Sequence, residues 1–174
     1  MSLLAMEPRL PLPPLQGPRV AGVEASRADE PRLQGCLEAA PGYFALTEGA
    51  PPAPDAAARL LDEAEADPAR RVFLLEPRRG GGALGVLDLW LDQPEPGTAH
   101  VGLLLLAERH QGQGLGAEAT GALERSLAAA GYGLLRLSVG DENPGAHAFW
   151  ERLGFAPVGR LDGGVTVYEK PLPG

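Results

Sequence analysis

The sequence has little cysteine, little histidine and no long apolar run. The single cysteine, Cys36, allows no internal disulfide, and with only three histidines, at positions 100, 110 and 147, no metal site is expected. No segment approaches the ~20 consecutive apolar residues that a helix needs to span a bilayer. These absences predict a reducing, cytoplasmic compartment, no bound metal and no membrane partner.

Positive charge is also scarce. The 174 residues carry 15 Lys and Arg against 23 Asp and Glu, a formal net charge of -8. Such a surface repels nucleic-acid phosphates and anionic lipid and attracts small cations, so nucleic acid is not an expected partner. The length and the 44% hydrophobic content suit one domain with a sizeable core, which we place at residues 18–174.

The N-terminal residues 1–17 differ from the rest in composition. Leu10–Leu15 contains three prolines, too many for the apolar helix of a secretion signal. We therefore expect residues 1–17 to form a disordered or extended arm that precedes the domain.

Apolar periodicity and turn residues predict an alternation of strands and helices. The expected strands cover residues 19–24, 71–76, 83–92, 98–107, 135–139, 156–161 and 165–169. The expected helices cover residues 29–40, with Asp29 as the cap, a segment from residue 55, residues 115–130, and a short helix capped by Asn143 and ended by Gly154. The link 41–54 is expected to be an ordered loop at best. Strands 98–107 and 135–139 flank a helix, so they should be parallel neighbours.

The most informative segment runs from Leu103 to Gly116. An apolar strand leads into Gln-Gly-Gln-Gly-Leu-Gly at residues 111–116, and an alanine- and leucine-rich helix follows at once. Such a turn gathers unpaired backbone N–H groups at the positive end of the helix dipole, which suits a diphosphate. The segment therefore predicts a site for a phosphorylated cofactor.

Two other kinds of phosphate-binding loop have partly the same residue pattern. Gly114, Gly116 and Ala119 satisfy the GxGxxA dinucleotide fingerprint, with Asp141 and Glu142 beyond the usual distance for a ribose-binding acid. A dinucleotide fold needs more alternating strands and helices than the remaining residues supply. A Walker loop is excluded because no Lys followed by Ser or Thr closes the glycine run. A structural turn without ligand is a further alternative, although three glycines exceed what it requires.

Two motifs together resemble the GNAT superfamily of N-acetyltransferases. The acyl-CoA motif Q/R-x-x-G-x-G/A maps onto Gln111, Gly114 and Gly116. The second signature, N-x-x-A-x-x-x-Y-x-x-x-G-F, maps onto residues 143–155, where Trp150 occupies the tyrosine position. The resemblance covers residues 84–160. It implies a mixed α/β (α+β) fold with a mostly antiparallel central sheet of about 6–7 strands, a splayed parallel pair and flanking helices.

The resemblance also implies the cofactor and its site. Acetyl-CoA would be the co-substrate, with Leu104 and Leu106 offering main-chain groups to the pantetheine arm. The N–H groups of a continuous loop would bind the pyrophosphate: Gln111, Gly112, Gln113, Gly114, Leu115 and Gly116. Asn143 would cap its helix, reach the pantetheine or acceptor, or do both. Phe149 is expected to belong to the core and to line the slot.

The implied activity is transfer of an acetyl group to a primary amine of a small molecule or peptide by direct attack. A catalytically idle acyl-CoA-binding or sensing module is the alternative. His100 is the first candidate for the general base because its free pKa lies near working pH. Glu108 and Asp88 are alternatives, although Glu108 could be a solvated partner of Arg109 and Asp88 a solvent-facing residue.

Two further expectations concern the rest of the protein. The indole of Trp150 is too weak an acid to replace a tyrosine that protonates the thiolate, so another group or water would do so. The terminal strands offer edges on which a homodimer could form.

Overall fold

The computed structural model describes residues 11–174, so the first ten residues of the predicted arm lie outside the described part. The strands form one eight-stranded sheet in the order β1-β2-β3-β4-β5-β6-β8-β7. In chain order they are β1 (Leu15–Gln16), β2 (Val20–Glu24), β3 (Arg70–Pro77), β4 (Gly85–Leu91), β5 (Thr98–Leu106), β6 (Leu134–Gly140), β7 (Ala156–Leu161) and β8 (Val165–Pro171). The helices are α1 (Glu30–Glu38), α2 (Pro41–Thr47), α3 (Ala56–Ala66), α4 (Leu115–Ala129) and α5 (Pro144–Arg152), with 3₁₀ turns at Arg27–Asp29 and Glu108–His110.

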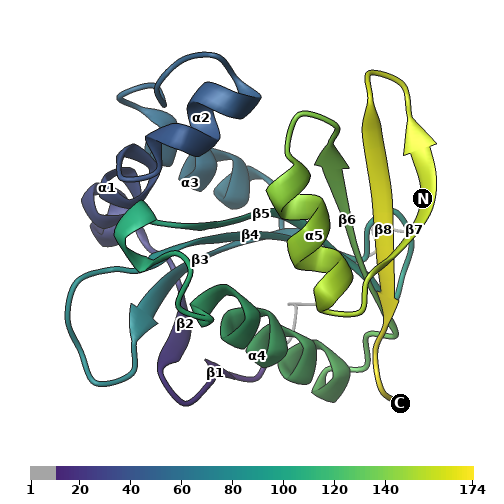
Figure 1. The fold of residues 1–174 in the computed structure, drawn as a ribbon. Coiled ribbons are helices and arrows are strands. Elements are labelled where there is room, and N and C mark those ends of the chain that lie inside the picture. The colour runs from purple at the N-terminus through teal and green to yellow at the C-terminus, as the bar shows by residue number, and fades with distance from the viewer. Residues whose placement is uncertain (1–10) are drawn as a thin grey trace, which may run out of the picture.

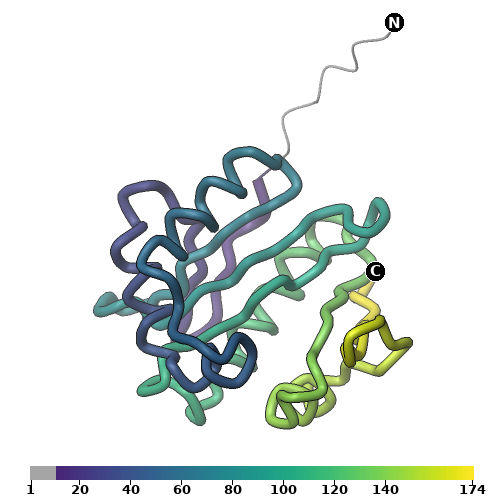
Figure 2. Tube along the Cα trace, turned by 90° about the horizontal axis from the view of Figure 1, so that it is seen from above, coloured from purple at the N-terminus to yellow at the C-terminus, as the bar shows by residue number. Residues whose placement is uncertain are grey.

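The sheet is antiparallel except at its centre. β5 and β6 are parallel neighbours. Residues Thr98–Val101 of β5 pair with residues Leu134–Leu137 of β6, and the later residues of β5 do not pair with β6. Beyond these residues the two strands diverge, as the view from above shows (Figure 2). The predicted mixed sheet with a splayed parallel pair is confirmed, with eight strands rather than six or seven.

Two hydrophobic cores form on the two faces of the sheet (Figure 1). α4 and α5 cover one face, where Leu123 and Leu127 of α4 are almost fully buried. α1, α2 and α3 cover the other, where Leu33 and Leu37 of α1 are equally buried. These helices therefore contact the sheet with their apolar faces.

One predicted loop is a helix. The link 41–54 contains α2, which has Pro41 at its first turn and a buried Phe44. Glu108, far away in the sequence, accepts a hydrogen bond from the N–H of Gly42 at 2.8 Å. A helix this short is marginal on its own, so these tertiary contacts stabilise it.

The predicted cap of the first helix is also wrong in detail. The Asp29 carboxylate makes no cap hydrogen bond to α1 and instead accepts one from the N–H of Ser26 at 2.9 Å. It therefore closes the 3₁₀ turn that precedes α1. Asn143 does cap its helix as predicted, because its Oδ1 accepts a hydrogen bond from the N–H of Ala146 at 3.1 Å.

The described part of the arm lies against the domain. Leu15 in β1 pairs with β2 and is buried, and the Ser126 hydroxyl of α4 donates a hydrogen bond to the Pro13 carbonyl. Among the helices within residues 11–174, none has the length and apolar character to cross a bilayer.

Candidate active site

A cavity of about 640 Å³ opens where β5 leaves β6. It lies between the end of β5, the start of α4 and one face of α5. Its lining residues are Leu104, Leu105, Leu106, Gln111, Gly112, Gly114, Leu115, Gly116, Ala117, Gly145, Phe149, Arg152 and Leu153. The glycine loop and the second motif, about thirty residues apart in sequence, thus border one space.

The glycine loop presents a row of unbonded donors to this cavity. The N–H of Gln111 donates to the Glu108 carbonyl, whereas the six N–H groups of residues 112–117 donate to no group within residues 11–174. Gly112 and Gly114 have φ values of 74° and 79°, in the left-handed region that favours glycine. Because the row ends at the N-terminus of the 15-residue α4, it fits the pyrophosphate of a coenzyme A molecule.

The start of α4 is also closely packed against α5. A Cβ built on Gly116 would lie 3.2 Å from Cζ of Phe149, whereas one built on Gly112 would meet nothing within 4 Å. Gly116 therefore allows Phe149 to approach the loop and form one wall of the cavity. Gly112 is required for its backbone conformation instead.

Two of the predicted cofactor residues do not line the cavity. The Gln113 side chain donates to the Arg109 carbonyl at 3.1 Å, and Asn143 is engaged in capping α5. Gln111 lines the cavity, but its Nε2 donates to the Leu106 carbonyl at 2.9 Å. This bond occupies an acceptor that the sequence assigned to the pantetheine arm.

Trp150, in the tyrosine position of the second motif, is buried in the core of α4 and α5. Its ring makes edge-to-face contacts with Phe149 and Phe155, with centroids 4.8 and 5.1 Å apart. It does not line the cavity. This position therefore contributes packing rather than an acid.

His100 projects toward the face of the sheet that carries α1, α2 and α3. Its neighbours Ala99 and Val101 belong to the opposite core, and it lies opposite Trp90 in β4 and Arg136 in β6. Burial lowers the pKa of His100 and the charge of Arg136 lowers it further, while Asp88 works against both. The imidazole is therefore neutral at pH 7 and can accept a proton.

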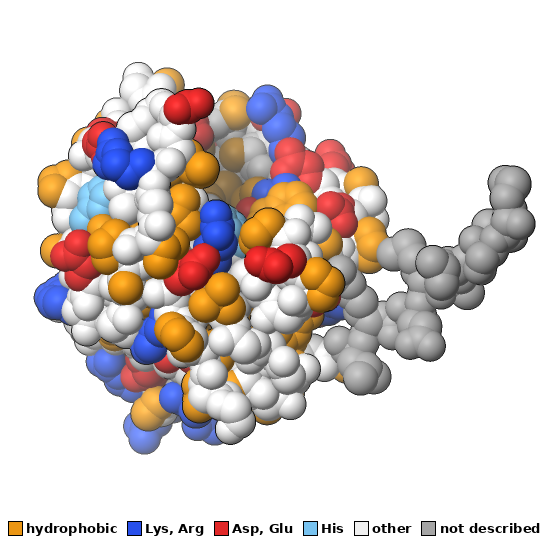
Figure 3. All heavy atoms as spheres, turned by 90° about the vertical axis from the view of Figure 1, so that its right-hand side faces the viewer, with side chains coloured by type: hydrophobic (Ala, Val, Ile, Leu, Met, Phe, Trp, Pro, Cys, Tyr) orange, Lys and Arg blue, Asp and Glu red, His pale blue; other side chains and the backbone are white. Residues whose placement is uncertain are grey.

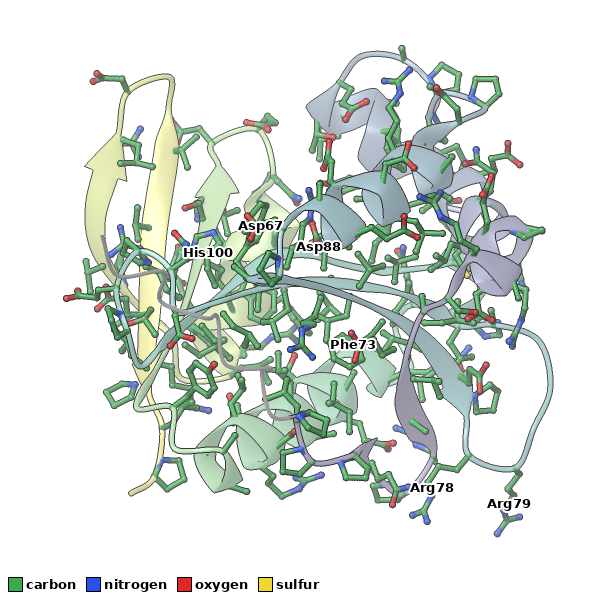
Figure 4. All side chains as sticks on the ribbon, turned by 180° about the vertical axis from the view of Figure 1, so that it is seen from behind. Asp67, Phe73, Arg78, Arg79, Asp88 and His100 are labelled. Carbon is green, nitrogen blue, oxygen red and sulfur yellow. The ribbon has the colours of Figure 1, made fainter. Side chains whose placement is uncertain are left out.

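The other two candidate bases are engaged elsewhere. Asp88 is 4% exposed rather than solvent-facing, and Arg70 holds its two oxygens at 2.8 and 2.7 Å. Arg70 also pairs with Glu63 of α3. Glu108 is exposed and bonded to Gly42. In the view from behind, His100 and Asp88 lie in the same region of the sheet, remote from the β3–β4 turn (Figure 4).

Two arginines near the cavity were not singled out from the sequence. Arg152 lines the cavity and forms no ion pair within the part of the chain that is described. Arg19 donates to the carbonyl of Gln113 at 3.1 Å, beside the glycine loop, and pairs with Glu118 at 2.9 Å. The spacing of Arg152, three residues after Phe149, could have placed it on the same helix face.

The molecular surface has a hollow on one side. Seen from the side of β7 and β8, a hollow opens near the top of the view, with hydrophobic side chains in its depth (Figure 3). An apolar hollow with a few polar groups is typical of a small-molecule site.

Comparisons with known proteins give one consistent result. The sequence model of the Acetyltransferase (GNAT) family matches residues 34–155. A crystal structure of an acetyltransferase from Thermus thermophilus is 37% identical, with 88% of this chain and 97% of that chain covered and a TM-score of 0.79.

Two more distant structures share the fold. The spermidine N-acetyltransferase of Vibrio cholerae, in complex with CoA and spermine, is 21% identical, with 88% of this chain and 95% of that chain covered and a TM-score of 0.68. RimL, a ribosomal L7/L12 alpha-N-protein acetyltransferase in complex with CoA, is 16% identical, with 92% and 98% covered and a TM-score of 0.74.

Proposed function

Because the chain belongs to the acetyltransferase (GNAT) family and is an acetyl-CoA-dependent acyltransferase, we propose that it acetylates a primary amine of a small molecule or peptide by direct attack. The observation that carries this proposal is the row of six unbonded N–H groups at residues 112–117 beside an apolar cavity. Those donors match a diphosphate, and the cavity matches a narrow apolar arm. The distant relatives named above act on a polyamine and on a protein N-terminus, and both are amines.

The proposed cofactor site uses backbone more than side chains. The N–H groups of Gly112 to Ala117 would bind the pyrophosphate, and the side of β5 at Leu104 that no longer pairs with β6 would pair with the pantetheine amides. Phe149 closes the apolar wall, and Arg152 supplies a positive charge to the phosphates in a protein whose net charge is -8.

The proposed chemistry needs a base on the other side of β5. Acetyl-CoA supplies the acetyl group as a thioester, so a C–N bond forms while the C–S bond breaks. His100, neutral at pH 7, would take the proton that the attacking amine releases. Water would protonate the departing thiolate, because the buried Trp150 offers no acid.

The test is release of free thiol from acetyl-CoA in the presence of a panel of amines. We expect release with at least one primary amine, and acetylated amine in equal amount by mass spectrometry. Thermal stabilisation should be large for CoA and absent for NAD, because only a ligand of the native state raises its stability. Tight CoA binding without thiol release from any amine would instead indicate the sensing module, and stabilisation by NAD would contradict the proposed site.

A further inference from the structure

The turn between β1 and β2, residues 17–19, is bound to the start of α4. Glu118, in the first turn of α4, holds it through a carboxylate that is largely shielded from solvent. Its Oε2 accepts hydrogen bonds from the N–H groups of Arg19 at 2.7 Å and Val20 at 2.8 Å, and its Oε1 accepts one from Nε of Arg19 at 2.9 Å. Glu118 therefore fixes both the backbone and the guanidinium of Arg19 relative to α4.

The neighbouring β3–β4 hairpin holds the same turn. The N–H of Arg78, which directly follows β3, donates to the Arg19 carbonyl at 2.9 Å. The Arg78 guanidinium donates to the Gly17 carbonyl at 3.3 Å, and the N–H of Gly17 donates to the Val20 carbonyl at 2.8 Å. The Arg19 side chain thus extends from a backbone whose N–H and carbonyl are both bonded.

The Arg19 guanidinium reaches the glycine loop. Its Nη1 donates to the Gln113 carbonyl at 3.1 Å, and a Cβ built on Gly114 would lie 3.4 Å from its Nη2. Gly112 and Gly114 line the cavity, whereas Gln113 and Arg19 do not. Arg19 therefore contacts the loop from outside the space that a cofactor would fill.

The bond from Arg19 determines which way one loop N–H points. The Gln113–Gly114 peptide is trans, so the Gln113 carbonyl and the Gly114 N–H point in opposite directions. Gln113 lies between Gly112 and Gly114, and because glycine adopts φ of either sign at similar cost, this peptide could rotate if nothing held it. The Gln113 side chain also donates to the Arg109 carbonyl at 3.1 Å. With the Gln113 carbonyl held outside the cavity, the Gly114 N–H is directed toward it.

Resting on the proposed function, we infer that Arg19 is a positioning residue for acetyl-CoA, acting through the Gln113–Gly114 peptide. Held by Glu118, it keeps the Gly114 N–H in the row of donors that would bind the diphosphate. A loop aligned in advance does not have to be ordered when the cofactor arrives, so affinity increases. Arg19 needs no contact with the reacting atoms for this role, and its effect is confined to the diphosphate part of the cofactor.

The first test measures the Kd of CoA by calorimetry. Arg19→Gln should raise it about ten-fold, because a charge-assisted hydrogen bond that fixes the loop is lost. Arg125→Gln is the matched control, since Arg125 donates to the Gln16 carbonyl of the same N-terminal segment at 3.1 Å. It removes the same charge away from the loop and should change the Kd by less than about two-fold. A Kd that Arg19→Gln leaves unchanged overturns the inference.

The second test separates the position of Arg19 from its charge. In Glu118→Gln the amide nitrogen cannot accept a hydrogen bond from Arg19, so the guanidinium loses its anchor while its charge remains. Removal of a negative charge near a diphosphate would by itself tighten CoA binding. The positioning role predicts the opposite sign, a Kd raised at least about three-fold. A Kd that is unchanged or lower in Glu118→Gln contradicts this role.

The third test uses a substrate that lacks the diphosphate. S-acetylpantetheine carries the same thioester as acetyl-CoA but no phosphate. Arg19→Gln should lower kcat/KM about ten-fold for acetyl-CoA and leave it unchanged for S-acetylpantetheine, while melting temperatures report folding. An equal loss for both substrates would indicate general damage to the site and overturns the inference. The proposed function itself fails only if the parent protein neither binds CoA nor releases thiol.

Discussion

At the scale of single residues, the charge state of His100 controls the proposed reaction. The imidazole lies half-buried between Trp90 and Arg136, and burial keeps its pKa below the ordinary value of 6.5. Asp88, nearby, is held by Arg70 and is unsuited to proton transfer. Only one of the three candidate bases is thus free to accept a proton.

The pH profile tests this assignment. An amine with a high pKa gives log(kcat/KM) a slope of one, and we expect the slope to steepen to two below pH 6.5, where His100 gains its proton. Arg136→Gln removes a positive charge that lowers the pKa, so the steepening should move to higher pH. In His100→Gln the slope should stay at one and the rate should fall about 10²-fold. Steepening that persists in His100→Gln would identify another base.

Asn143 offers a second test at this scale, because it caps α5 and stands in the second motif. Asn143→Ala should lower the free energy of unfolding by about 1 kcal/mol, the usual value of a cap. Asn143→Ser keeps a capping oxygen on a shorter side chain and should restore most of that stability. Chemical denaturation measures both, and calorimetry with CoA detects any contact beyond the cap. Equal stability of Asn143→Ala and the parent protein would contradict the capping role.

At the scale of elements, the proposed cofactor site lies at the junction of β5 and α4. The strand ends where its pairing to β6 has ceased, the loop leaves six N–H groups unbonded, and α4 begins. None of these elements forms the site alone. Their junction places the helix dipole, the free donors and the apolar wall around one cavity.

Substitutions in α4 test this arrangement. Gly116→Leu should raise the Kd of CoA at least ten-fold, because its Cβ lies 3.2 Å from Phe149 and its side chain would occupy the cavity. Gly121→Ala lies in the same helix, and its Cβ meets only the flexible end of Arg125. It should leave the Kd unchanged and add about 0.5–1 kcal/mol of stability. Calorimetry measures both affinities, and an unchanged Kd for Gly116→Leu would reject the proposed loop.

At the scale of the whole molecule, one sheet separates two cores. Leu37 of α1 is buried on one face and Leu123 of α4 on the other. The strands between them contribute side chains to both cores. The two layers should therefore unfold together. β7 lies at one edge with all six residues exposed, and the homodimer suggested from the sequence stays a prediction.

Cavity-forming substitutions test this coupling. Leu37→Ala and Leu123→Ala should each lower the free energy of unfolding by about 2–5 kcal/mol, and each variant should unfold in a single transition. Leu46→Ala, at a side chain that is 47% exposed, is the control and should change stability by no more than about 0.5 kcal/mol. Separate transitions in calorimetry for either core variant would show that the layers unfold independently.

The sequence by itself determined most of the elements and predicted a glycine loop suited to a phosphorylated cofactor. Periodicity, caps and turn residues act locally, so they predicted α4, α5 and seven of the eight strands. Tertiary structure decided what depends on distant residues. α2 exists because Glu108 and the core stabilise it, and Trp150 is buried because α5 packs on α4.

The surroundings of His100 belong to this second group. Arg70, Asp88 and Trp90 carry no motif, and only strand pairing brings them close to His100. Such pairing depends on the register between strands, which no single segment encodes. The sequence therefore predicted a loop for a phosphorylated cofactor, whereas the three-dimensional arrangement was needed to place the polar groups around His100.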